Sequence, residues 1–156
     1  MNAVELLKQD HQVVKQLLEK LVATTERGVK TRQDLLHKLH VELAVHTDIE
    51  EQIFYPAYEK AGGREEGVMS AEAKEEHRSV DSLVLPDLAK TDPATINFAG
   101  RAKVLKELLE HHIEEEEKEM FPKAQQLLGA QKLEELGKLM EERKRSLKQA
   151  LNSQAA

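Results

Sequence analysis

The two halves of this 156-residue chain match each other when the sequence is shifted by 66 residues. The match covers polar as well as apolar positions, and it places histidine on histidine and glutamate on glutamate. An internal repeat predicts that one structural unit occurs twice and that the copies pack together with approximate two-fold symmetry. The pairs that coincide are His11 with His77, His46 with His112, Glu50 with Glu116, Glu51 with Glu117, Pro56 with Pro122, Leu39 with Leu105 and Leu43 with Leu109.

The repeated unit is predicted to be a helical hairpin. Leu, Lys, Glu, Ala and Gln dominate, and the apolar–polar alternation of β-strands is absent. Glycines, prolines and capping residues predict helices that begin near residues 2, 31, 70, 92 and 130, the third of them fraying near Pro86. We therefore expect an all-α fold, an antiparallel four-helix bundle made of a duplicated helical hairpin over residues 1–128. An additional C-terminal helix over 129–151 would pack on the bundle or at a dimer contact, and 152–156 would form a tail.

One face of each predicted bundle helix is apolar at a spacing of three to four residues, except where histidine or glutamate interrupts it. In the second helix this face contains Leu39, Leu43, His46 and Glu50. A buried imidazole or carboxylate is costly unless it is paired, hydrogen-bonded or bound to a metal. Helix positions i and i+4 share a face. The spacing therefore directs six polar side chains into the core: His11, His46, Glu50, His77, His112 and Glu116.

Four imidazoles and two carboxylates from four helices predict a binuclear transition-metal site. Nitrogen and oxygen donors without sulfur favour iron, with manganese or zinc as alternatives. The chain has no cysteine, which excludes disulfides, thiolate zinc sites and cysteine-bound iron–sulfur clusters. A net charge of −6 and 3% aromatic residues argue against nucleic-acid binding and against a large stacking site. No signal segment or membrane-length apolar run is present, so we expect a cytoplasmic protein without a membrane partner.

The remaining histidines and several acidic residues are not expected to bind the metal directly. His37 and His40 fall off the apolar face, and His111 is expected to face solvent beside His112. Asp10 and Glu76 precede predicted ligands and are interpreted as surface charges, with a role behind the ligand histidines as the alternative. The charge run at Glu114, Glu115 and Glu117 is interpreted as a solvated face.

The motifs Asp10-His11, His46-Thr-Asp-Ile-Glu50-Glu51, Glu76-His77-Arg78 and His112-Ile-Glu-Glu-Glu116-Glu117 resemble the hemerythrin/HHE cation-binding family. The resemblance covers about residues 1–128 and is strongest to small bacterial hemerythrin-like proteins of the mycobacterial type. It implies a non-haem, oxo-bridged di-iron site. By this resemblance, His11 and His46 would hold one iron, His77 and His112 the other, and Glu50 and Glu116 would bridge the two.

One departure from the family concerns a fifth histidine. Oxygen-carrying hemerythrins add it through an HxxxH pair on the third helix, but the positions four away from His77 are Ala73 and Asp81. Tyr55 is a candidate replacement ligand if a π-bulge before Pro56 turns it toward the metals, and a buried core tyrosine otherwise. Asp81 is a weaker candidate.

The predicted function is that of a di-iron protein that reacts with hydrogen peroxide, nitric oxide or dioxygen, with no catalytic residue distinct from the metal ligands. Catalase-like or nitric oxide-directed activity follows from the resemblance, and spacing alone does not select between them. The alternatives are a non-enzymatic protein that binds, senses or stores dioxygen or iron, and a bundle that a metal such as zinc merely stabilises. We expect a monomer or a weak homodimer.

Overall fold

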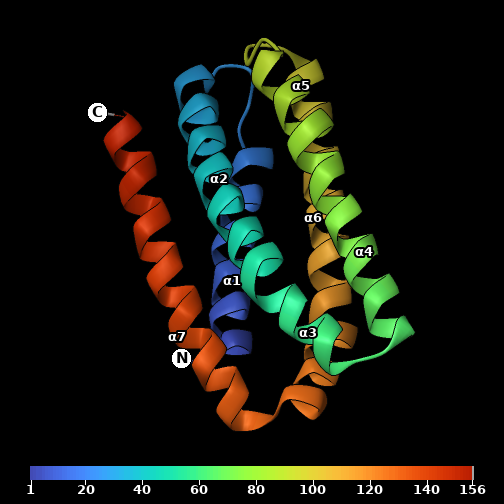
Figure 1. The fold of residues 1–156 in the computed structure, drawn as a ribbon. Helices are drawn as coiled ribbons and strands as arrows, with labels where there is room; N and C mark the ends of the chain where they lie inside the picture. The colour runs from blue at the N-terminus through green and yellow to red at the C-terminus, as the bar shows by residue number, and fades with distance from the viewer. Residues whose placement is uncertain (156) are drawn as a thin grey trace.

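The computed structural model describes the backbone of residues 1–155 and the side chains of residues 1–153. Within these residues the chain is helical and has no strand, which confirms the predicted all-α class. Four helical rods form the predicted antiparallel bundle, and a further long helix lies beside it (Figure 1). The elements, with η for a π-helical segment, are α1 (Ala3–Val22), α2 (Val29–Ile49), η1 (Glu50–Phe54), α3 (Tyr55–Ala61), α4 (Arg64–Ser79), η2 (Val80–Val84), α5 (Leu85–Lys90), α6 (Ile96–Glu115), η3 (Glu116–Met120) and α7 (Phe121–Ala155).

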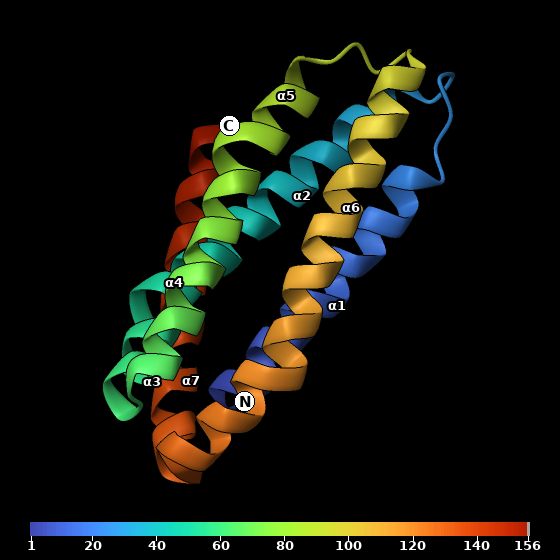
Figure 2. The ribbon, with the colours of Figure 1, turned by 90° about the vertical axis from the view of Figure 1, so that its right-hand side faces the viewer.

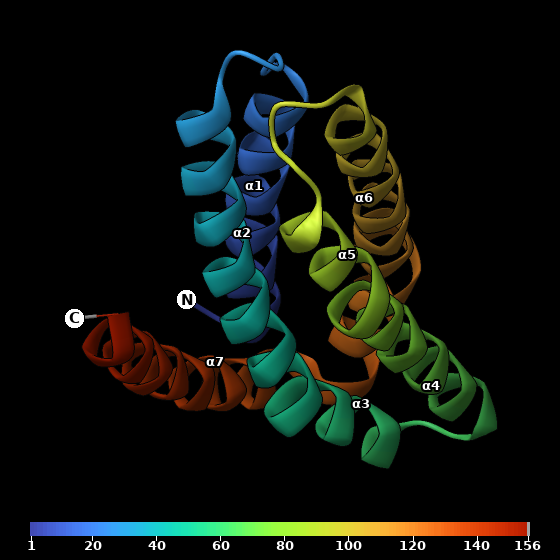
Figure 3. The ribbon, with the colours of Figure 1, turned by 90° about the horizontal axis from the view of Figure 1, so that it is seen from above.

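Three of the four rods each consist of α-helices joined end to end by a short π-helical segment. The first rod is α1 alone, the second joins α2, η1 and α3, and the third joins α4, η2 and α5. The fourth rod runs from α6 through η3 into the start of α7 (Figure 2). The view along the bundle shows the rest of α7 outside the four rods, on the side of α1 and α2 (Figure 3).

A proline follows each π-helical segment by two residues, at Pro56, Pro86 and Pro122. Proline cannot donate a backbone hydrogen bond, and its ring clashes with the carbonyl four residues back; the extra residue of a π-helical turn relieves both conflicts. The bulge before Pro56, one of the two alternatives that the sequence leaves open, is present, because the N–H of Tyr55 bonds to the carbonyl of Glu50, five residues back. The predicted fraying near Pro86 is wrong, since α5 continues the rod beyond it.

Two helices begin at positions that differ from the prediction, and a side-chain hydrogen bond explains each. α4 begins well before residue 70, because the Glu66 carboxylate accepts a hydrogen bond from the Gly63 N–H at 3.0 Å and closes its first turn. α6 begins later than residue 92, because the Thr95 hydroxyl caps the N–H of Phe98 at 3.3 Å.

The core of the bundle consists of two apolar clusters. The cluster at the lower end of the bundle in Figure 1, here called the lower cluster, surrounds the start of α1, η1 and η3. It includes Leu7, Ile49, Phe54, Tyr55 and Phe121. The second cluster, here called the upper cluster, fills the opposite half of the bundle. Its members include Val14, Leu18, Leu39, Leu105 and Leu109. Because Leu7 belongs to one cluster and Val14 to the other, the buried polar residues between them in α1, Asp10 and His11, lie at the junction of the two clusters.

α7 turns back along the bundle after Gly129, whose φ of 78° lies in the left-handed region that glycine adopts readily. The helix then packs Leu133, Leu136 and Met140 into the lower cluster. The helix continues to Ala155, because no glycine or proline ends it earlier. The expected tail at 152–156 is therefore wrong over 152–155. Residue 156 lies outside the described residues. None of the described helices carries an apolar stretch of the length needed to cross a membrane.

Candidate metal centre

A layer of buried polar side chains lies between the two apolar clusters. The structure brings together there all six side chains that the repeat singled out, and none exposes more than 6% of its surface. Every rod of the bundle contributes to the layer. The members are His11 from α1, His46 and Glu50 from the second rod, His77 from the third, and His112 and Glu116 from the fourth.

The two glutamates connect the histidines of one half of the repeat to those of the other. Each histidine has its Nε2 atom 3.2 Å from a glutamate Oε1 atom. Glu50 lies between His46, of its own half, and His77 of the other half. Glu116 lies in the same way between His112 and His11. The two-fold symmetry that the sequence repeat predicts is therefore present in the arrangement of these side chains.

Two groups of donor atoms in this layer are compact enough to surround a cation. In each group the donor atoms lie within 4.8 Å of one another. Glu50 belongs to both groups, so the two positions are adjacent. The first donor group is His11, His46, Glu50 and Glu116, and the second donor group is Glu50, His77 and His112.

The Nδ1 atom of each histidine points outward to a second carboxylate, and these four acids are here called the outer carboxylates. Because a carboxylate accepts the ring N–H, each Nδ1 donates outward and each Nε2 faces into the layer. The pairs are His11 with Glu117 at 2.7 Å, His46 with Asp10 at 3.0 Å, His77 with Glu51 at 2.6 Å and His112 with Glu76 at 2.7 Å.

The outer carboxylates correct two sequence interpretations. Glu117 is not simply part of a solvated charge run, because its carboxylate is bonded to the buried ring of His11. Asp10 and Glu76 are not mere surface charges either, which favours the alternative of a role behind the histidines. The repeat itself contained the missed signal, since Asp10 coincides with acidic Glu76, and Glu51 with Glu117.

The layer contains buried polar atoms without hydrogen-bond partners. They are His46 Nε2 and both carboxylate oxygens of Glu50. His46 Nε2 and Glu50 Oε1 are close enough for an ion pair, but their geometry does not align for a hydrogen bond. Burying such atoms without partners is unfavourable, and a cation between the imidazoles and the carboxylate would satisfy them. The residues present therefore fit a bound metal.

The pKa values of the buried histidines and glutamates reflect the opposite charges that face each other in the layer. Burial by itself lowers the pKa of His46, but the Glu50 charge and the Asp10 hydrogen bond outweigh it and raise that pKa to about 10. Burial likewise opposes the pKa shift of Glu116, whose pKa lies well below its usual value because His112 and other donors face the carboxylate. Without a metal, protons on the imidazoles would balance the buried carboxylates.

Tyr55 is the point at which the centre departs from two-fold symmetry. The bulge of η1 turns its buried side chain into the layer, where the hydroxyl donates to Glu116 Oε2 at 2.7 Å and lies 3.5 Å from His77 Nε2. Its ring stacks on His77 with a centroid distance of 5.7 Å. The matching position of the repeat is Phe121, which stacks on His11 at 5.6 Å. One side of the centre thus has a hydroxyl where the other has only a phenyl ring.

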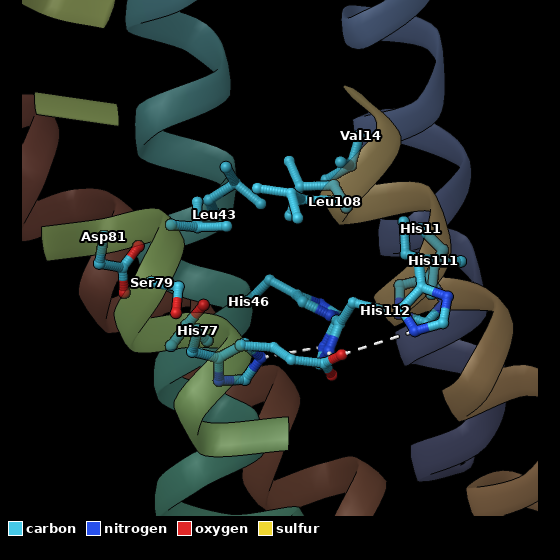
Figure 4. A pocket seen from close by; sticks show the side chains of 15 residues that line it. His11, Val14, Leu43, His46, His77, Ser79, Asp81, Leu108, His111 and His112 are labelled. Carbon is cyan, nitrogen blue, oxygen red and sulfur yellow. Dashed lines mark hydrogen bonds and ion pairs between the residues drawn. The ribbon is translucent and has the colours of Figure 1, made fainter. Parts of the chain in front are cut away.

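A cavity of about 120 Å³ opens onto the histidines from the side of the upper cluster (Figure 4). Val14, Leu43 and Leu108 lie on its apolar wall, and His46, His77 and His112 lie opposite. A space of this size admits a molecule of a few atoms. Asp81 borders the cavity but belongs to neither donor group. The three remaining histidines, His37, His40 and His111, are exposed as predicted.

Comparison with known proteins agrees with this geometry. The family model of the hemerythrin HHE cation binding domain matches residues 2–124. Proteins of Mycobacterium tuberculosis and Mycobacterium bovis are each 32% identical over 141 residues, which cover 90% of this chain and 83% of theirs. The crystal structure of an HHE cation binding domain-containing protein from Mycobacterium kansasii superposes with a TM-score of 0.83 at 31% identity. That match covers 96% of this chain and 89% of the other.

Proposed function

The chain belongs to the hemerythrin HHE cation-binding domain family, and we propose that its buried layer holds two iron ions that react with hydrogen peroxide or nitric oxide. One observation carries the proposal. Glu50 is fully buried, belongs to both donor groups, and has neither oxygen hydrogen-bonded. A carboxylate in that position is suited to bridge two cations.

The residues of the two donor groups would hold the metals. His11 and His46 would hold the first iron, and His77 and His112 would hold the second. Glu50 belongs to both groups, and the family resemblance adds Glu116 as a second shared carboxylate. Donor sets of nitrogen and oxygen without sulfur favour iron, and zinc or manganese are the competing metals. The second donor group has three members where the first has four. The Tyr55 hydroxyl, close to His77, would be the further oxygen ligand on that side.

When bound, a pair of iron ions can exchange two electrons with one small oxidant. The chain determines what reaches that pair. The apolar cavity beside the histidines admits small uncharged molecules, and its Val14, Leu43 and Leu108 walls disfavour ions and larger solutes. The outer carboxylates hold the imidazole rings in one orientation while the oxidant reacts.

Peroxide is the reactant that needs no other partner. One hydrogen peroxide is oxidised to dioxygen while a second is reduced to two waters, so electrons and protons balance between the two molecules. Reduction of two nitric oxide molecules to nitrous oxide and water instead consumes two electrons and two protons. That reaction therefore requires an external electron donor.

The test is oxygen release from peroxide by the iron-loaded protein, followed with an oxygen electrode. We expect release above that of the same concentration of free iron and above that of zinc-loaded protein. His46→Ala should abolish the excess, whereas His37→Ala, the same substitution at an exposed histidine, should leave it unchanged. Release no faster than free iron would refute the peroxide reaction. A reversible change of the visible spectrum on deoxygenation, without release, would indicate a dioxygen-binding protein instead.

A further inference from the structure

Beyond Gly129, α7 is linked to the polar layer by a chain of charged groups. The Lys144 ammonium of α7 donates to Asp10 Oδ1, and Asp10 Oδ2 accepts the Nδ1 proton of His46 at 3.0 Å. Asp10 is the most deeply buried of the four outer carboxylates, with 3% of its side chain exposed. Lys144 is thus linked through one carboxylate to the ring of a proposed metal ligand.

The other outer carboxylates have no such support. Glu51, Glu76 and Glu117 have 25–30% of their side chains exposed. Within the described residues, no lysine or arginine lies within ion-pair distance of these three. The part of α7 that carries Lys144 lies outside the sequence repeat, so no lysine of the repeat occupies the equivalent place behind Glu76. The support behind His46 is therefore an asymmetry that α7 adds to an otherwise symmetric layer.

A buried carboxylate is held in its ionised form only if donors and positive charge compensate its burial. Asp10 meets this condition through its contacts, because one carboxylate oxygen accepts from His46 Nδ1 and the other from the Lys144 ammonium. If Lys144 were neutral, Asp10 would lose its cation and would hold the His46 ring less firmly. Partners that orient a metal-bound histidine in this way typically change metal affinity by about 10–100-fold.

We propose that Lys144 is a positioning residue: it fixes Asp10 against His46 and so makes the first of the two metal positions slower to release its ion than it would otherwise be. The inference rests on the proposed function, because it requires His46 to be a metal ligand. It assigns to α7 a role beyond packing, which is to make the two metal positions unequal.

The chain offers a close control for this role. Lys148, one turn further along α7, pairs with Glu42 of α2 at 3.2 Å, so it also ties α7 to the bundle but does not contact an outer carboxylate. A general effect of weaker α7 docking would appear in Lys148→Met as well as in Lys144→Met. An effect transmitted through Asp10 would appear in Lys144→Met alone.

The experiment follows the anaerobic release of ferrous iron from loaded protein to an excess of a coloured ferrous chelator. In Lys144→Met we expect one of the two iron equivalents to leave about tenfold faster than in the native protein, and the other to leave at the native rate. Lys144→Arg, which keeps the charge, should restore the native rate. Lys148→Met should change neither equivalent.

Three results would overturn the inference. The first is release of both equivalents from Lys144→Met at the native rates, and the second is equal acceleration of both. The third is the same acceleration in Lys148→Met. A native protein that retains no iron would refute the proposed function and this inference with it, whereas native loading with any of the three results would refute the inference alone. Thermal unfolding of the metal-free variants, followed by circular dichroism, measures any loss of α7 docking separately.

Discussion

Tyr55→Phe removes one hydrogen bond from the polar layer without opening a cavity. The hydroxyl donates to Glu116 Oε2 at 2.7 Å, and the ring can stay stacked on His77. Phenylalanine already occupies the matching place in the other half of the repeat, as Phe121. The lost interaction is a buried hydrogen bond to a charged acceptor, worth about 1.5–3 kcal/mol. For a chain of this length, about 2 kcal/mol lowers the melting temperature by roughly 4–8 °C.

The assay is thermal and denaturant unfolding of the metal-free protein, with Tyr58→Phe as the matched control. Tyr58 is also buried, but its hydroxyl donates only to the sulfur of Met69 at 3.6 Å, so its loss should cost well under 1 kcal/mol. In the iron-loaded protein, Tyr55→Phe should alter the visible absorption spectrum and Tyr58→Phe should not. Equal stability losses in the two variants would refute the hydrogen-bond argument. An unaltered spectrum in Tyr55→Phe would refute Tyr55 as a ligand.

Three further predictions concern the docking of α7, the pH dependence of the metal-free protein and the outer carboxylates. A Cβ on Gly137 would lie 2.2 Å from the backbone oxygen of Met1, so Gly137→Ala should lower the free energy of unfolding by about 1–3 kcal/mol despite its gain in helix propensity. Gly100→Ala, with open space around the new Cβ, should raise it by about 0.5–1 kcal/mol, and a loss in both variants would contradict the packing argument. Since the pKa of His46 is raised to about 10 in the folded state from 6.5, its contribution to stability is fully present below pH 6.5 and is lost as the pH rises toward 10. Denaturant titrations of the metal-free protein should show that loss, and equal stability at pH 6 and pH 10 would refute it. Glu117→Gln should weaken metal binding by about 10–100-fold, measured by competition with a chelator, whereas the exposed Glu114→Gln should not. Equal affinity of the two variants would exclude the proposed role of Glu117.

The sequence repeat was sufficient to predict the bundle and the six residues of its polar layer. The 66-residue shift matches both apolar and polar positions. Few ways of packing the helices would give every buried polar side chain a partner of opposite charge or a hydrogen bond. The sequence also offered the bulge before Tyr55 as an alternative, because the proline that follows Tyr55 cannot sit in a regular α-helix without strain.

What the sequence alone did not predict depends on contacts between distant segments. The ion pair of Lys144 with Asp10 joins residues 134 positions apart, and neither falls in a motif that suggests the other. Glu117 looked like one member of a charge run. Its match with Glu51 in the repeat hinted at a role, and the structure identifies His11 as its partner. Helix starts failed for local reasons. Ser70, the expected cap, lies inside α4, whose first turn Glu66 closes, and Thr95 rather than Asp92 caps α6.

The metal content of the protein after loading with ferrous iron and removal of unbound metal tests the central claim most directly. Elemental analysis should give two iron ions per chain for the native protein. His46→Ala should retain less, and the exposed control His37→Ala should retain two. One iron or none in the native protein, or zinc in place of iron after purification from cells supplied with both metals, would contradict a paired iron centre.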